Sequence, residues 1–255
     1  MRKQPPIYIC IDTSGSMHGE RITAINAGLQ ALLTSLRQDP YALEMVYLAI
    51  TTFDSQIKEV LPLTQLMEVV QPEITCGKSG ATFLGGALEA VAHAVQRDLI
   101  PRNGQRKGDS RPNLIIITDG KPSDPLAYSE AIPHIKGLNF DNIIVCGIGK
   151  KIDFASLRQL TETIVLTDEI NADNCAEFFI WAEQTMMRYI RWADDLPVDV
   201  ELPILPPPAA PAGFYLLPQS GFSRRLPIYL CIDTSGSMRG EPIKMVNDAL
   251  QILRS

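Results

Sequence analysis

The sequence predicts an α/β fold with a doubly wound, mostly parallel central sheet, helices on both faces and one short antiparallel edge strand. Two observations predict this fold. Short apolar runs bounded by proline, glycine or polar turns are typical of strands buried on both faces. Between these runs, apolar residues recur at every third or fourth position, which is typical of helices. Strands that alternate with helices form βαβ units, and such units build parallel sheets.

The first half of the chain contains three predicted strands and two predicted helices. Residues 7–11 are apolar throughout and lie between Pro6 and a turn, so they predict a buried strand. Residues 45–52 predict a second strand, and residues 57–61 a shorter one at the edge of the sheet. The helices are predicted by apolar side chains at helical spacing: Ile22, Ile25, Leu29, Leu32, Leu33 and Leu36 in the first, and Leu84, Leu88, Val91, Ala92 and Val95 in the second.

The second half repeats the alternation. Residues 114–118 form an apolar run that ends at Asp119, and residues 143–148 and 164–166 are further predicted strands. Helices are predicted near residues 126–136 and by the spacing of Phe178, Ala182, Met186 and Tyr189. Open α/β sheets bind ligands outside the carboxyl ends of their strands. We therefore expect Asp12 and Asp119, which both follow buried strands, at one edge of the sheet.

The chain divides into three predicted parts. Residues 1–192 form a complete α/β domain, and the proline-rich residues 193–225 form an extended linker. Residues 226–255 begin a second copy, because residues 6–34 and 227–255 share 18 identities in 29 positions. One strand and one helix cannot bury their own apolar face. We expect either a truncated tandem domain or a unit that packs on the first domain or on another copy.

Composition argues against several classes of function. The net charge is −6 and no basic stripe carries interleaved aromatic residues, so nucleic acid is not the expected partner. No apolar stretch has the length of a membrane span, and the N-terminal apolar run is too short for a secretory signal. The five cysteines form no Cys-x-x-Cys pair, so we expect free thiols in a reducing cytoplasm.

Asp12, Ser14 and Ser16 follow the first strand in the pattern Asp-x-Ser-x-Ser. Alternate side chains of such a turn can point at one centre, and each offers a hard oxygen atom of the kind that suits Mg²⁺ or Mn²⁺. Thr82 adds a hydroxyl from the sequence Ser-Gly-Ala-Thr at 79–82, and Asp119 adds a second carboxylate from another strand end. The sequence therefore predicts a divalent-cation site for binding and no catalytic triad.

These three motifs, in this order, resemble the metal-ion-dependent adhesion site (MIDAS) of von Willebrand factor A domains, and the resemblance covers residues 6 to about 192. It implies that Asp12, Ser14, Ser16, Thr82 and Asp119 hold the cation directly or through water. It also implies that an aspartate or glutamate of a partner protein fills the open coordination position.

Longer phrases are similar to the bacterial TerY-like branch of that family. They are Pro-Ile-Tyr-Ile-Cys-Ile-Asp-Thr-Ser-Gly-Ser-Met-His-Gly-Glu at 6–20, Ser-Gly-Ala-Thr-Phe-Leu-Gly-Gly-Ala-Leu at 79–88 and Ile-Ile-Thr-Asp-Gly-Lys-Pro-Ser-Asp at 116–124. This branch is associated with tellurite resistance and chemical stress, and is often encoded beside a protein kinase and a protein phosphatase. The resemblance implies a scaffold or signalling protein rather than an enzyme.

Other interpretations of these residues stay open at the level of sequence. Asp12 with Ser14, Thr82 and Asp124 are all residue types that cap helices, and Asp54 is expected in a turn. His18 is expected at the rim that faces a partner. A Mg²⁺-dependent hydrolase of phosphoesters would also keep an open metal position, although the sequence offers no evident general base or nucleophile. A structural domain with a vestigial site is the third alternative.

Overall fold

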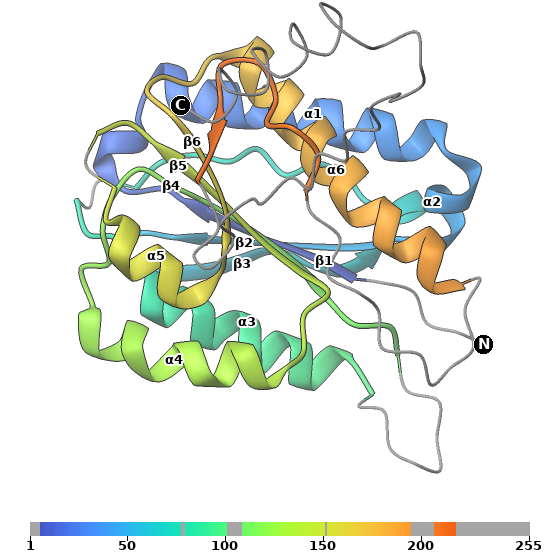
Figure 1. Cartoon of the computed structure of the whole chain (residues 1–255), viewed down its shortest axis with the longest axis horizontal. Helices are drawn as coiled ribbons and strands as arrows, with labels where there is room; N and C mark the ends of the chain where they lie inside the picture. Colours follow the sequence, from blue (N-terminus) through green and yellow to red (C-terminus); the bar gives the residue numbers. More distant parts are fainter. Residues whose placement is uncertain (1–5, 78–79, 101–108, 151, 195–206, 218–255) are drawn as a thin grey trace, which may run out of the picture. The chain divides into compact units, whose positions relative to one another are not determined.

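The computed structural model describes residues 6–77, 80–100, 109–150, 152–194 and 207–217. They form a seven-stranded sheet in the order β3-β2-β1-β4-β5-β6-β7 (Figure 1). The inner strands are parallel, namely β2 (Tyr47–Phe53), β1 (Pro6–Asp12), β4 (Asn113–Thr118), β5 (Asn142–Ile148) and β6 (Thr163–Thr167). β3 (Ile57–Gln65) and β7 (Tyr215–Leu216) pair antiparallel at the two edges. The predicted fold class is confirmed, with a second antiparallel edge strand added.

The side chains of the inner strands alternate between two apolar cores. On β1, Ile7, Ile9 and Ile11 pack into one core, whereas Tyr8 and Cys10 pack into the other. All residues of β1 are buried, as expected of a parallel strand covered on both faces. The strand therefore ends at a position fixed from both sides of the sheet.

Helices cover both faces of this sheet. α1 (Glu20–Gln38), α2 (Pro40–Met45) and α6 (Ala172–Asp194) lie over one face, and α3 (Leu84–Asp98), α4 (Pro125–Gly137) and α5 (Phe154–Leu160) lie over the other (Figure 1). Short 3-10 turns, Gly15–Met17 and Leu66–Glu68, follow β1 and β3. The four predicted helices are present as α1, α3, α4 and α6.

Two short helices are not predicted by apolar spacing. α2 begins after Asp39, whose carboxylate accepts the backbone N–H of Tyr41 at 3.1 Å, with Pro40 at its first position. α5 begins after Asp153, whose carboxylate accepts the N–H of Ala155 at 3.2 Å. Each helix spans fewer than two turns, which is too short for a periodic pattern. Their capping aspartates are the signal that marks them.

Residues 207–217, which lie within the predicted linker, pack against the domain. β7 pairs with β6, and the N–H of Leu217 donates to the carbonyl of Ile164 at 2.9 Å. The ring of Phe214 stacks on that of Phe178, with the ring centroids 5.7 Å apart. These residues therefore belong to the domain and not to a spacer, because Phe214 and Leu216 extend its apolar core at the edge of the sheet.

The predicted second copy at residues 226–255, with its motif Asp233-x-Ser235-x-Ser237, lies outside the described residues, as does Ser79. The first domain extends beyond its predicted end at residue 192, since α6 ends at Asp194 and β7 follows. Within the described ranges, no helix combines the length and the apolar character needed to cross a membrane.

Candidate metal centre

The chain order of the sheet reverses between β1 and β4, two adjacent parallel strands. From β1 the sheet continues to β2 on one side and to β4 on the other. Such a switch point is where open α/β sheets bind their ligands. Asp12 is the last residue of β1, and Asp119 directly follows Thr118, the last residue of β4. The structure thus places the two carboxylates of the predicted site at one edge of the sheet.

Asp12 is fully buried, and two hydrogen bonds hold its carboxylate. Oδ1 accepts the N–H of Ser14 at 2.9 Å, and Oδ2 accepts the hydroxyl of Thr118 at 2.8 Å. Burial raises the pKa of Asp12, while the hydrogen bonds from Ser14 and Thr118 oppose that rise. Asp12 and Ser14 do not cap α1, because that helix begins at Glu20 and its N-cap residue is Gly19.

Hydroxyl groups connect the serine pair to the second carboxylate. The Oγ atoms of Ser14 and Ser16 lie 3.3 Å apart, and the Ser16 hydroxyl donates to Oδ1 of Asp119 at 2.8 Å. Ser14 is fully buried and Asp119 is 5% exposed, whereas Ser16 is exposed. These side chains and Asp12 form one polar cluster that opens to solvent at Ser16.

Thr82 reaches the same edge from the loop before α3. Its N–H donates to the hydroxyl of Ser123 at 3.1 Å, and the N–H of Ser123 donates to the carbonyl of Thr82 at 2.9 Å. A Cβ added at Gly120 would stand 3.3 Å from Oγ1 of Thr82, so this hydroxyl lies against the turn that follows Asp119. The turn at residues 120–123, distant in sequence, therefore holds Thr82 beside the cluster.

Asp124 caps the N-terminus of α3 rather than that of its own helix. Its carboxylate accepts the N–H of Gly85 at 3.1 Å and the N–H of Gly86 at 2.8 Å. Asp124 is the N-cap residue of α4, as expected of a capping residue, but its side chain makes no hydrogen bond there, because α3 and α4 pack side by side and the free N–H groups of α3 lie within reach. Thr82 precedes Phe83, the N-cap residue of α3, so Asp124 also fixes the loop that carries Thr82.

Arg21 is the residue of this site that the sequence did not reveal. It lies in the first turn of α1, and its Nη1 donates to Oδ2 of Asp119 and, at 3.2 Å, to the carbonyl of Ser16. Its side chain is 33% exposed, against 4% for Asp119. The second copy has Pro242 at the matching position, so the repeat gives no hint of this arginine. A basic residue one turn after the motif is the only local signal.

A family model described as von Willebrand factor type A domain matches residues 7–175. The chain belongs to this family. A second model with the same description matches residues 227–254, outside the described part of the chain. No curated protein matches the sequence.

Solved structures that contain von Willebrand factor type A (VWA) domains are similar in fold. A VWA protein from Catenulispora acidiphila has a TM-score of 0.54 at 18% identity, covering 71% of this chain and 42% of that one. The pilus adhesin SpaC from Lactobacillus rhamnosus GG has a TM-score of 0.54 at 14% identity, covering 71% and 30%. Proximal thread matrix protein 1 from the mussel byssus, with a zinc-occupied MIDAS motif, has a TM-score of 0.52 at 14% identity, covering 75% and 46%. This chain spans less than half of each of them.

The donor atoms at the switch point fit a hard divalent cation. Within the part of the chain that the structure describes, no three His, Cys, Asp or Glu side chains cluster as metal ligands. The polar cluster at the switch point instead brings together two carboxylates and three hydroxyl groups, from Asp12, Asp119, Ser14, Ser16 and Thr82. Two carboxylates balance the charge of one divalent ion, and all five groups offer the oxygen ligands that Mg²⁺ and Mn²⁺ prefer.

Residues 73–77 form a rim beside Asp12. The N–H of Gly77 donates to the carbonyl of Thr13 at 3.1 Å, and Nε2 of His18 lies 2.9 Å from the carbonyl oxygen of Gly77. Burial, followed by the charge of Asp12, raises the pKa of Cys76 to about 11.

Proposed function

We propose that this VWA domain is a metal-ion-dependent module for protein–protein interaction. Asp12, Ser14, Ser16, Thr82 and Asp119 would hold Mg²⁺ or Mn²⁺ directly or through water. The observation that supports this assignment is the contact from Ser14 through Ser16 to Asp119, which gathers side chains 103 positions apart at the switch point of the sheet. A bound divalent ion would supply an electrophilic centre there.

The partner would present an aspartate or glutamate to this centre. Two carboxylates and neutral hydroxyls do not saturate a divalent ion, so a carboxylate from outside gains a metal bond in a contact that excludes water. A chain of net charge −6 would thus bind an acidic partner through the metal, and not despite its own charge. His18 and residues 73–77 border the centre and would form the rim of the contact.

Binding rather than catalysis is the role that the described side chains support. Nucleophilic catalysis by serine needs a general base hydrogen-bonded to the hydroxyl. The hydroxyl of Ser16 donates to Asp119 and lies against that of Ser14, whereas the ring of His18 faces a backbone carbonyl. No feature of this arrangement favours the hydrolase alternative.

The wider role is proposed from the resemblance of the three phrases to the TerY-like branch. It would make the chain a cytoplasmic scaffold in resistance to tellurite and chemical stress, with a kinase or phosphatase of the same system as the partner. The second family match, at residues 227–254, supports a tandem arrangement in which another VWA domain begins at about residue 226.

Cation binding is the first test of the proposal. Titration calorimetry with MgCl₂ and MnCl₂ should detect one site in the wild-type domain, and Asp119→Asn should abolish it while the circular dichroism spectrum stays unchanged. Glu177→Gln is the matched control, because it removes one exposed carboxylate from α6. Equal cation binding by Asp119→Asn and wild type would contradict the assignment.

Partner binding is the second test. Affinity capture from a lysate of the source cells, in Mg²⁺ and in EDTA, should retain a set of proteins with the wild type in Mg²⁺ that Asp119→Asn does not retain. The same proteins captured in all conditions would contradict a metal-bridged contact.

A further inference from the structure

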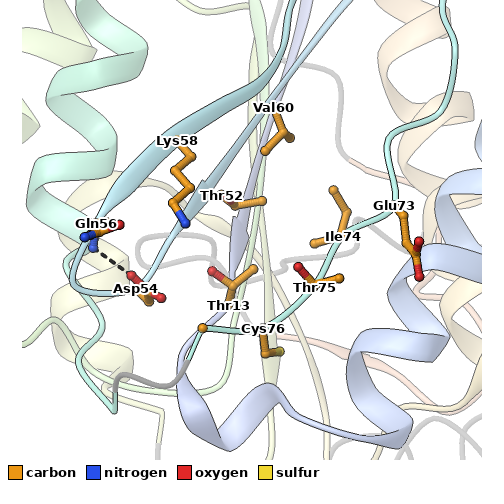
Figure 2. Close-up of a pocket in the computed structure, with 11 residues that line it drawn as sticks. Thr13, Thr52, Asp54, Gln56, Lys58, Val60, Glu73, Ile74, Thr75 and Cys76 are labelled. Carbon is orange, nitrogen blue, oxygen red and sulfur yellow. Dashed lines mark hydrogen bonds between the residues drawn. The ribbon is translucent and has the colours of Figure 1, made fainter.

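A hollow of about 120 Å³ opens near the proposed metal centre, and Figure 2 shows the residues that line it. It lies between the β2–β3 hairpin and residues 73–77. Thr13, the residue between Asp12 and Ser14, lines it and connects it to the centre. One water molecule needs about 10–15 Å³ of such space, so the hollow has room for a polar side-chain group.

The wall formed by residues 73–77 is fixed at both ends. The N–H of Ile74 donates to Oδ1 of Asn26 on α1 at 2.9 Å, and Nδ2 of Asn26 donates to the carbonyl of Ile74 at 2.8 Å. At the other end, the N–H of Gly77 donates to the carbonyl of Thr13. The hollow is therefore formed before any ligand arrives.

Hydrogen-bond donors without a partner face this hollow. Lys58 stands opposite Thr52 across the β2–β3 pair, and its amino group extends toward Thr52 and Thr13 (Figure 2). Among the residues that the structure describes, Lys58 forms no ion pair. Over the same residues, the hydroxyls of Thr13, Thr52 and Thr75 form no hydrogen bond, although Thr13 and Thr52 are only 4% and 6% exposed.

Two carboxylates also line the hollow: Asp54 is engaged through Oδ1 in a turn, and Glu73 lies apart from Lys58. Oδ1 of Asp54 accepts the N–H of Gln56 at 2.7 Å and closes the turn between β2 and β3, the role expected for Asp54. The carboxylate of Glu73 points away from Lys58 (Figure 2). The ammonium of Lys58 and the hydroxyls of the three threonines are therefore hydrogen-bond donors of the hollow without a described partner, and together they suit an anion.

We propose that this hollow receives a second acidic side chain of the partner, close in sequence to the one that would bind the metal. The inference rests on the proposed function. Lys58 pairs with this carboxylate, and the hydroxyls of Thr13, Thr52 and Thr75 are placed to donate to it. Because Thr13 belongs to both the metal motif and the hollow, the two subsites are adjacent. The partner segment is thus recognised by two acidic residues and not by one.

Blocked synthetic peptides test this inference, with titration calorimetry in Mg²⁺ and in EDTA. One peptide carries a single aspartate among glycines, and three others add a glutamate one, two or three positions further on. In Mg²⁺, at least one doubly acidic peptide should bind the wild type about tenfold more tightly than the single-aspartate peptide, the gain expected of one charge-assisted contact. Lys58→Gln should remove this advantage and leave the binding of the single-aspartate peptide unchanged.

Lys136→Gln is the matched control, since it removes one exposed ammonium from the end of α4. The inference is overturned if no doubly acidic peptide has an advantage, or if the advantage survives Lys58→Gln. If the single-aspartate peptide binds with equal affinity in Mg²⁺ and in EDTA, the proposed function is overturned instead. The Lys58-dependent advantage is measured separately in either condition, so the two failures are distinguishable.

Discussion

The guanidinium of Arg21 donates to the carboxylate of Asp119, which lies 98 positions further along the chain. The contact joins the first turn of α1 to the end of β4 and neutralises a carboxylate whose side chain is only 4% exposed. In the proposed site, a divalent cation would bring its charge to the same carboxylate. Arg21 and the cation therefore compete for Asp119.

Replacing Arg21 should separate its contribution to stability from its competition with the cation. Arg21→Gln is expected to lower the free energy of unfolding in EDTA by about 1 kcal/mol, a value kept small because the arginine is one-third exposed. The same change should tighten Mg²⁺ binding by about tenfold, because a positive charge next to the ion is lost. Urea unfolding in EDTA and calorimetric titration with MgCl₂ measure the two quantities.

Arg188→Gln is the control for this variant, since Arg188 is exposed on α6. Added Mg²⁺ should stabilise Arg21→Gln more than the wild type, because a ligand that binds only the folded state stabilises in proportion to its affinity. Weaker Mg²⁺ binding in Arg21→Gln than in the wild type would show that Arg21 supports the site instead of competing for it.

Gly85 marks the closest approach of α3 and α4. A Cβ at this position would lie 2.2 Å from the backbone nitrogen of Tyr128 and 2.5 Å from the carbonyl carbon of Ala127. Backbone atoms cannot move aside as a flexible side chain can, so Gly85→Ala should destabilise the domain by about 3 kcal/mol in urea unfolding. Gly137→Ala, also in a helix but with open space around the added methyl group, should leave stability unchanged or slightly raised. Equal stability of the two variants would refute the close contact.

The sequence predicted the parts of the site that follow strands. Asp12 and Asp119 follow apolar runs whose length and composition mark buried parallel strands, and the rule for ligands at strand ends placed the pair together. Ser14 and Ser16 follow from the spacing of the turn, since they lie within four residues of Asp12. Local patterns were sufficient here because the topology of the sheet converts strand ends into neighbours.

Contacts made by side chains across helices could not be predicted in this way. Arg21 meets Asp119, and Asp124 meets Gly85, through the packing of elements that no local pattern relates. The docking of residues 207–217 was hidden for another reason. A proline-rich composition is typical of a spacer, and β7 is only two residues long, so its pairing depends on the free edge of β6 and not on its own sequence.

Phe214 should contribute to the stability of the domain although it lies in the proline-rich region. It is 8% exposed and stacks on Phe178, so Phe214→Ala should lower the free energy of unfolding by about 3 kcal/mol. Tyr215→Ala is the control, because Tyr215 is 52% exposed and should cost less than about 0.5 kcal/mol. Urea unfolding of both variants measures this difference. Equal stability of Phe214→Ala and wild type would indicate that residues 207–217 act as a spacer and not as part of the domain.

Asp141, just before β5, should make the stability of the domain depend on pH. Burial raises its pKa to about 6, against the lowering effect of Arg111 at 3.9 Å, whereas an aspartate in an unfolded chain titrates near about 3.9. The folded protein thus holds this proton more tightly than the unfolded chain does. As pH rises from about 4 to about 6, the unfolded chain loses the proton first, so this group lowers the stability across that window and has a constant effect above it.

Asp141→Asn removes this titration and should be more stable than the wild type at pH 7. The difference between the two proteins should grow from near zero at about pH 4 to at most about 3 kcal/mol above about pH 6, since each pKa unit corresponds to about 1.4 kcal/mol. Urea unfolding of both proteins at four pH values between these limits measures the difference. Other titrating groups are common to both proteins, so their contributions cancel. Glu130→Gln, an exposed site on α4, should follow the wild-type profile. A difference that stays constant across the window would show that the carboxyl of Asp141 is hydrated in the folded protein.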